Sequence, residues 1–273
     1  MNDTERLSLS GRRWRIAPRL SPEDLGAVTD LPPLAVQLLH NRGLRGAEAI
    51  GEFVAGGMPP HDPFLMDGME AAAGRLLRAV AGGERVCIYS DYDADGVTSC
   101  SVLTLMLRSL GLDPIAYFPD RRREGYGPNV EAMLGLREKG ASVVVTVDCG
   151  TGAHEALAAA ADAGLDVIVV DHHVAEAKLP RAVAVINPNR LDESGAHGEL
   201  AAVGVAYLLV VGLNRALRQA GWFSRQAEPD LLPWLDLVAL GTICDVAPLT
   251  GVNRALVAQG LKVMARRGNV GLK

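Results

Sequence analysis

The stretch VCIYSDYDADGVTSC, at Val86–Cys100, decides the fold of this chain. It opens as a short apolar run rich in Val, Ile and Tyr and ends in three acids, Asp91, Asp93 and Asp95. A glycine and a helical pattern follow, which is typical of a buried parallel strand that leads into a helix. Ligands bind at the carboxyl ends of such strands, so these acids either hold a cation or form a solvated acidic turn.

Strands and helices alternate at short intervals beyond this stretch. We expect strands at residues 86–90, 114–118, 142–147, 166–170 and 182–186. We expect helices at residues 69–80, 97–110, 129–139, 154–163, 201–218, 231–240 and 252–266. This alternation predicts an α/β fold with a doubly wound, mainly parallel sheet that is flanked by helices and followed by C-terminal helices.

The beginning of the chain does not share this alternation. Short helices are expected at residues 34–44 and 47–54, and three prolines between residues 59 and 63 impose an extended connector after them. The sequence therefore predicts a helical and extended N-terminal segment at residues 1–67 and a main α/β domain at residues 68–273.

Composition limits the classes of protein to which the chain can belong. Of its 273 residues, 49% are apolar and only 4% are aromatic, which favours an aliphatic core over disorder. The net charge of −5 excludes a uniformly basic protein but not a local basic groove for nucleic acid. The four cysteines lie far apart, so neither a disulfide framework nor a zinc site is expected. Without an apolar signal region or a bilayer-length stretch, we expect a soluble, cytoplasmic protein that has no membrane partner.

Two further predicted strands and one helix also end in acids or histidines. SVVVTVDCGTG carries Asp148, DVIVVDHHV carries Asp171, His172 and His173, and LGTICDVAPL carries Asp245. The carboxyl ends of parallel strands share one edge, so we expect these side chains to converge with the acids of the first stretch. Carboxylates with imidazoles and no thiolate suit Mn²⁺ or Mg²⁺. So many acids favour two ions that share a bridging carboxylate, about 3.5–4 Å apart, as in two-metal phosphoesterases.

The motifs SDYDADGVTS, VDCGTG, VDHH and GTICDVAPL, in this order, closely resemble the four motifs of the DHH phosphoesterase superfamily. Three further stretches, HDPFLMDGMEAA, REGYGP and INPNR, are similar to the RecJ family of single-strand-specific exonucleases within it. The resemblance covers roughly residues 31–273. Members of that family continue into a DHH-associated domain and a nucleic-acid-binding domain, and these residues carry no motif of either. We therefore interpret the chain as the N-terminal catalytic core of a longer protein, with reduced activity on its own.

The resemblance implies a role for each matching residue. The metal ligands that it implies are Asp93, Asp95, Asp148, His172 and Asp245, with Asp148 as the bridging carboxylate. Asp91 is implied as an outer ligand or as a support for the ligands, and His173 as a contact to the scissile phosphate or as such a support. The residues implied to contact the substrate are Arg123, Tyr126, Asn187 and Arg190. They would do so by pairing with phosphates and by stacking on bases. Many relatives have a histidine at the position of Tyr89, so one metal would be held more loosely here.

The activity that the resemblance implies is hydrolysis of single-stranded DNA in the 5′→3′ direction. Two Mn²⁺ or Mg²⁺ ions would activate water and release 5′-mononucleotides, in DNA repair and recombination. Single-stranded DNA is then the substrate, and a single-strand-binding protein or a helicase is the implied protein partner. Two alternatives stay open at this point. One is an oligoribonuclease or cyclic-dinucleotide phosphodiesterase of the same superfamily, and the other is an inactive scaffold of the replication machinery.

Overall fold

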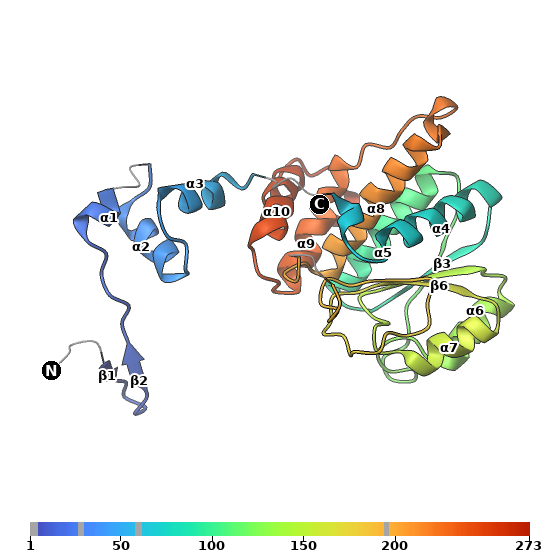
Figure 1. Cartoon of the computed structure of the whole chain (residues 1–273), viewed down its shortest axis with the longest axis horizontal. Helices are drawn as coiled ribbons and strands as arrows, with labels where there is room; N and C mark the ends of the chain where they lie inside the picture. Colours follow the sequence, from blue (N-terminus) through green and yellow to red (C-terminus); the bar gives the residue numbers. More distant parts are fainter. Residues whose placement is uncertain (1–4, 27–29, 58–61, 194–196) are drawn as a thin grey trace. The chain divides into compact units, whose positions relative to one another are not determined.

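The structure is a computed structural model that describes residues 5–26, 30–57, 62–193 and 197–273 (Figure 1). By its contacts the chain divides into two compact units, residues 1–57 and residues 58–273. The functional residues singled out above all belong to the second unit.

The first unit combines a short hairpin with three helices. Antiparallel strands β1 and β2 are followed by α1, α2 and α3, with the bounds Glu5–Leu7, Arg13–Arg15, Pro22–Gly26, Pro33–Asn41 and Ala47–Ala55. The sequence predicts α2 and α3 but not the hairpin, because strands of three residues are too short to show an alternating pattern.

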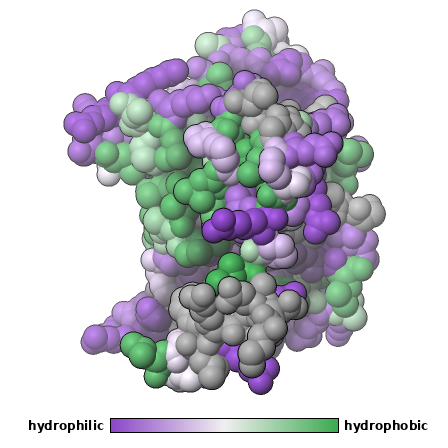
Figure 2. All heavy atoms as spheres, turned by 90° about the vertical axis from the view of Figure 1, so that its left-hand side faces the viewer, coloured by the Kyte–Doolittle hydropathy of each residue, from purple (hydrophilic) through white to green (hydrophobic). Residues whose placement is uncertain are grey.

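Hydrophilic and hydrophobic residues are interspersed on the face of the molecule that Figure 2 draws.

The second unit is built on a sheet of five parallel strands in the order β4-β3-β5-β6-β7. In chain order, β3 to β7 are Val86–Ser90, Ile115–Tyr117, Val143–Val147, Asp166–Val170 and Ala184–Ile186. Every residue of β3, β5 and β7 is buried, as is all of β6 after its first residue. The continuous β-branched runs of the sequence therefore reflect strands that are covered on both faces.

Helices cover both faces of this sheet (Figure 1). One face carries α6 and α7, which are Val130–Glu138 and His154–Asp162. The opposite face carries α4, α5 and α8, which are Met69–Gly82, Ala94–Ser109 and Ala202–Gln219. Two further helices, α9 at Leu235–Cys244 and α10 at Gly251–Met264, pack against each other, and α9 also packs on α5. Short 3₁₀ turns are Pro63–Leu65, Trp222–Ser224, Leu232–Trp234 and Val270–Leu272. The predicted doubly wound α/β fold is confirmed.

The strand order places a topological switch point between β3 and β5. From β3 the chain crosses to β4, which lies on the side of β3 away from β5. From β5 it proceeds to β6 and β7, which lie on the side of β5 away from β3. The connections therefore leave β3 and β5 in opposite directions, and their carboxyl ends are the topological switch point where open α/β sheets bind ligands. Asp91 follows β3, and Asp148 follows β5.

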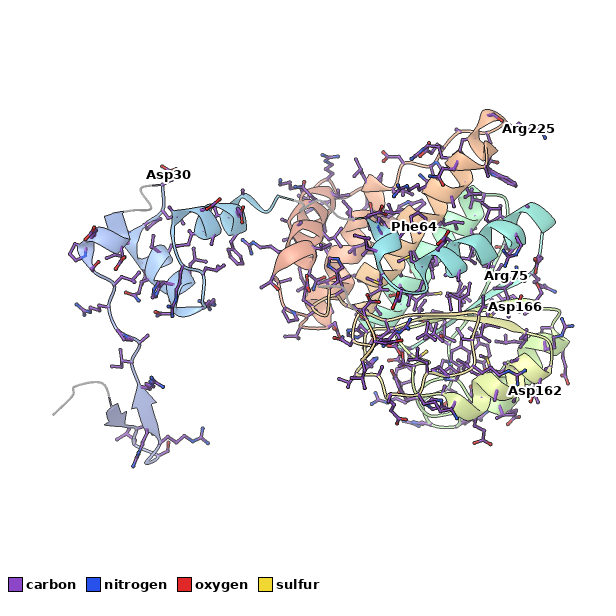
Figure 3. All side chains as sticks on the ribbon, viewed as in Figure 1. Asp30, Phe64, Arg75, Asp162, Asp166 and Arg225 are labelled. Atoms are coloured by element: carbon purple, nitrogen blue, oxygen red, sulfur yellow. The ribbon has the colours of Figure 1, made fainter. Side chains whose placement is uncertain are left out.

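Two segments differ from the sequence-based expectation. The helix expected at residues 231–240 is a 3₁₀ turn at Leu232–Trp234 followed by α9, because Pro233 has no amide hydrogen for a regular helix interior. The segment just before α4 belongs by its contacts to the second unit rather than to the N-terminal segment. Asp62 forms a 2.8 Å ion pair with Arg215 of α8, and the ring of Phe64 (labelled in Figure 3) has its centre 5.4 Å from the same guanidinium. In the described part of the chain, no helix combines the length and apolar character needed to cross a membrane.

Arg75 joins helix α4 to the amino-terminal side of the sheet. It is only 7% exposed, and its Nε donates to Asp166 at the start of β6 at 2.5 Å (Figure 3). Its two terminal nitrogens donate to Glu84 at 3.0 and 2.6 Å. Ser142, beside β5, donates to the same Glu84 carboxylate at 2.7 Å. One guanidinium therefore connects a helix with the starts of three strands.

Replacing Arg75 by alanine is expected to lower the free energy of unfolding by about 2 kcal/mol, because two partly desolvated carboxylates lose their partner. Arg108→Ala is the matched control. The ion pair of Arg108 with Asp113 is exposed on both sides, so its loss is expected to cost less than about 0.5 kcal/mol. Urea unfolding followed by circular dichroism measures both, and equal losses would contradict a structural role for Arg75.

Candidate metal centre

The acids after β3 are placed by the start of helix α5. Asp93 is the N-cap of α5, and its Oδ1 accepts a hydrogen bond from the Gly96 amide at 3.0 Å. A β-carbon on Gly96 would lie 2.5 Å from the Asp91 carbonyl oxygen, so only glycine lets the helix begin this close to the strand end. The Asp-x-Asp-x-Asp-Gly pattern thus gathers three carboxylates around one tight strand-to-helix turn.

Asp95 links two helices. This residue is 1% exposed, and its two carboxylate oxygens accept hydrogen bonds from the amides of Ala202 (2.7 Å) and Val203 (2.8 Å) at the start of α8. The N-cap residue of α8 is Ala201, which offers no side-chain cap of its own. A carboxylate at a helix N-terminus is favoured by the helix dipole. Asp95 therefore caps α8 from another helix, and each of its oxygens keeps a second lone pair for a cation.

Asp148 has the left-handed backbone conformation, with φ of 59°. Asp tolerates this region better than most residues, and the turn that it makes directs the chain away from β5. The residue is 2% exposed and lies between strand β5 and the next helix, at the switch point of the sheet. Its central position matches the bridging role that the resemblance implies.

His172 lies at the middle of the acids. Its Nε2 is 3.2 Å from Asp148 Oδ1, 3.8 Å from Asp95 Oδ2 and 4.0 Å from Asp245 Oδ2. Asp245 is the C-cap of α9, one turn after Gly241. A β-carbon on Gly241 would lie 2.2 Å from Thr98 Oγ1, so the glycine lets α9 approach α5 and bring Asp245 to the centre.

His173 and Tyr126 border the centre. His173 Nδ1 lies 2.8 Å from Asp171 Oδ1, and Tyr126 donates its hydroxyl to the Asp148 carbonyl at 2.9 Å. The two rings meet edge to face, with 5.9 Å between their centres. Asp171 ends β6 in the same way as Asp148 ends β5, and the strand-end pattern of the sequence places it at this edge without giving it a role. The structure supplies that role, because Asp171 bonds the His173 ring.

Three overlapping groups of side chains could each hold a cation, with their candidate ligand atoms within 4.8 Å of one another. The groups are Asp91, Asp93 and Asp148; Asp95, His172 and Asp245; and Asp148, His172 and His173. All six predicted catalytic residues and Asp91 are therefore brought to one place. Their roles as metal ligands stay predictions.

Two buried oxygens test whether a cation fits. Asp91 Oδ1 and Asp148 Oδ1 accept no hydrogen bond from the described residues. The His172 ring approaches Asp148 Oδ1 without hydrogen-bond direction. A buried acceptor that lacks a partner costs about 1–3 kcal/mol. Oxygen ligands with one or two imidazoles suit Mn²⁺ or Mg²⁺, so the residues present fit such an ion.

The titration of the centre reflects its burial and crowding. Burial raises the pKa of Asp148 to about 7, and the nearby Asp95 and Asp93 charges contribute to the rise. Burial likewise raises the pKa of Asp95 to about 6. Burial opposes the charged form of His172, but the carboxylates of Asp148 and Asp95 outweigh it and raise its pKa to about 9. The centre therefore holds protons that a metal ion must displace.

The four predicted substrate residues have different surroundings. Tyr126 is at the centre and 55% exposed. Arg123 is exposed and lines a hollow beside α6 with Tyr117 and Glu124. Of the three consecutive arginines at residues 121–123, Arg121 is the one that affects the acids. Burial raises the pKa of Asp91, and the charge of Arg121 lowers it to a smaller extent. The Arg121 guanidinium lies 5.3 Å from the centre of the Tyr92 ring.

Asn187, which is predicted to contact substrate, has its side chain engaged within the protein. Asn187 is fully buried, and its amide donates to Thr151 Oγ1 and to the His173 carbonyl. Arg190 is similarly engaged, because its Nε and Nη2 donate to Asp192 and its Nη1 donates to the Val185 carbonyl at 2.8 Å. Both side chains therefore form bonds within the protein, and their roles as substrate contacts stay predictions.

Tyr89 is also part of the core. Its side chain is fully buried, stacks on Tyr117 with 5.0 Å between ring centres, and donates to the Gly127 carbonyl at 2.8 Å. The residue that departs from the family pattern therefore packs β3 against β4. The looser metal site expected from this departure stays a prediction.

The fold and the site define an α/β domain with a candidate metal centre of acids and histidines at the switch point of the sheet. The DHH family, N-terminal domain, matches residues 85–242, which is more than half of the chain. The chain belongs to the DHH family.

Among characterised relatives, the single-stranded-DNA-specific exonuclease RecJ of Salmonella typhimurium is 41% identical over 248 residues, covering 89% of this chain and 42% of the relative. The protein of the same name from Bacillus subtilis is 39% identical over 268 residues, covering 97% of this chain and 32% of the relative. The solved structure of RecJ from Thermus thermophilus in complex with Mn²⁺ superposes with a TM-score of 0.72 at 31% identity, covering 93% of this chain and 35% of that one. The predicted resemblance is confirmed, and the chain spans less than half the length of these relatives.

Mn²⁺ affinity is expected to rise with pH between about 6 and about 8, because the ion displaces a proton from His172 and from Asp148. Each displaced proton contributes up to about tenfold in affinity per pH unit. Titration calorimetry in two buffers of different ionisation enthalpy measures both the affinity and the protons released. An affinity that does not change with pH, without proton release, would contradict this centre as the binding site. His172→Gln is expected to reduce the increase in Mn²⁺ affinity per pH unit.

Proposed function

We propose that this chain carries the catalytic centre of a metal-dependent exonuclease that hydrolyses single-stranded DNA. The observation that supports the proposal best is the convergence of Asp148 and His172 with the acids of β3 and α9 at the switch point of the sheet. The names of the relatives supply the substrate class. The 5′→3′ direction, the release of 5′-mononucleotides and a place in DNA repair and recombination belong to the proposal and rest on the resemblance.

In this proposal Asp93, Asp95, Asp148, His172 and Asp245 would hold two Mn²⁺ or Mg²⁺ ions, with Asp91 as a further candidate ligand. Such ions supply Lewis-acid polarisation of a phosphoryl oxygen and a water that is activated for in-line attack. Asp148 belongs to two of the three candidate groups and would be the carboxylate that contributes to both metal positions. The backbone bonds of Asp95 and the cap of Asp93 hold these carboxylates in place before the substrate arrives.

His173 is proposed to bind the scissile phosphate. Asp171 faces its Nδ1, which assigns the proton to that nitrogen and leaves Nε2 for the substrate. The bond to Asp171 raises the pKa of His173, against the effect of burial, and so favours the charged ring that a phosphate attracts. Tyr126 offers an exposed ring for base stacking, and Arg121, beside the acids, offers a guanidinium for a phosphate. Arg123 stays a proposed phosphate contact at the edge of the same loop.

The test is release of mononucleotides from a 5′-phosphorylated single strand in the presence of Mn²⁺. Asp148→Asn removes the charge while keeping a residue that tolerates the left-handed backbone, and we expect it to lower the rate by about a thousandfold or more. Asp162→Asn is the matched control, because Asp162 is the last residue of α7 (labelled in Figure 3) and forms an exposed ion pair with Arg181. It is expected to leave the rate unchanged.

Three further substrates separate the proposal from its alternatives. Short RNA dimers, cyclic dinucleotides and blunt duplex DNA are assayed beside the single strand. Preference for the single strand, lost in Asp148→Asn, supports the exonuclease. Hydrolysis of the dimers or cyclic dinucleotides without hydrolysis of the single strand would overturn it, and so would equal rates for wild type and Asp148→Asn.

A further inference from the structure

The His172–His173 dipeptide lies outside the helices and strands, so no regular ladder satisfies its backbone. Side chains do this instead. Asp171 Oδ1 accepts hydrogen bonds from the amides of His172 (2.8 Å) and His173 (3.3 Å). Both N–H groups of the dipeptide are therefore taken by the carboxylate that also faces the His173 ring.

Two asparagines bind the carbonyl groups of the same dipeptide. Asn189 Nδ2 donates to the His172 carbonyl, and Asn187 Nδ2 donates to the His173 carbonyl at 2.8 Å. All four backbone polar groups of the two histidines are thus bonded by side chains from only three residues. A backbone segment that depends on side chains alone is fixed only as well as those side chains are fixed.

The asparagines are themselves held by a turn that follows β7. Asn187 Oδ1 accepts a hydrogen bond from the Asn189 amide at 2.8 Å, which forms an Asx turn around Pro188. This bond also fixes which end of the Asn187 amide is the oxygen, so its nitrogen must face Thr151 and His173. Arg190 anchors the turn through its 2.8 Å bond to the Val185 carbonyl.

We propose that Asn187 and Asn189 are positioning residues that set the direction of the two histidine rings by holding their peptide planes. The inference rests on the proposed function in giving those rings to the metal and the substrate. A rotation of either plane would move the ring nitrogens relative to Asp148 and Asp171, and misplacement by about 1 Å can cost two orders of magnitude in rate. Partners that orient metal-ligating histidines typically contribute about ten- to a hundredfold in metal affinity.

Two substitutions at each position separate positioning from simple electrostatics. Leucine keeps a similar shape and removes the donor, whereas Asp keeps the shape, removes the donor and adds a negative charge near the centre. We expect Asn187→Leu, Asn189→Leu, Asn187→Asp and Asn189→Asp all to lower Mn²⁺ affinity by about ten- to a hundredfold, measured by calorimetry. Unchanged affinity in both leucine variants, or tighter binding in both aspartate variants, would overturn the proposal.

Asn214→Leu is the matched control for loss of a buried amide. Asn214 is 4% exposed on α8, and its Nδ2 donates to Glu228 at 2.7 Å, outside the centre. We expect this variant to lose thermal stability while its Mn²⁺ affinity stays within about twofold of wild type. An equal loss of Mn²⁺ affinity in Asn214→Leu would show a general effect of destabilisation and would overturn the positioning role.

A second readout does not depend on the metal. In the apo protein labelled with ¹⁵N, the His173 Nδ1–H that bonds Asp171 is expected to give a protected imidazole resonance in wild type and in Asn214→Leu, and to lose it in Asn187→Leu. Retention of this resonance in Asn187→Leu would count against the proposal. If wild type neither binds Mn²⁺ nor releases nucleotides, the proposed function fails, and this resonance still decides whether Asn187 orients the His173 ring.

Discussion

The structure depends on one unfavourable arrangement, the burial of several carboxylates against one another at the carboxyl edge of a parallel sheet. Asp91, Asp95 and Asp148 are buried at the point where β3 and β5 send the chain in opposite directions. Their burial, and to a smaller extent the repulsion from neighbouring carboxylates, raises their pKa values. A divalent cation relieves both effects at once, and so the same crowding that destabilises the protein alone creates affinity for a metal.

The carboxylates do not depend on the metal for their positions. Asp93 caps α5, Asp95 caps α8, and Asp148 occupies a left-handed turn, so each is fixed by backbone geometry. Gly96 lets α5 begin close to the end of β3, and Gly241 lets α9 approach α5. The folding energy of a large aliphatic core is thereby used to hold charges that would otherwise separate, which is how preorganised sites avoid reorganisation during reaction.

Much of this could be predicted from the sequence because strand ends are visible in it. Continuous apolar runs that stop at an acid locate β3, β5 and β6, and parallel pairing then brings the acids to one edge. The surroundings of individual side chains are not visible in this way. Asn187 and Arg190 look like substrate contacts in a motif, but whether an amide faces a ligand or a backbone carbonyl depends on packing between β7 and the histidines. Asn189 is not predicted for the same reason. The short N-terminal hairpin is not predicted because its strands are too short to show an alternating pattern of apolar and polar residues.

The central claim is that the crowded carboxylates form one shared metal centre with Asp148 at its middle. Crystals of the protein soaked in Mn²⁺, measured at the manganese absorption edge, test it most directly. The account predicts two anomalous peaks at the carboxyl edge of the sheet, both in contact with the Asp148 carboxylate. Peaks that lie elsewhere, or a single peak that does not touch Asp148, would contradict it.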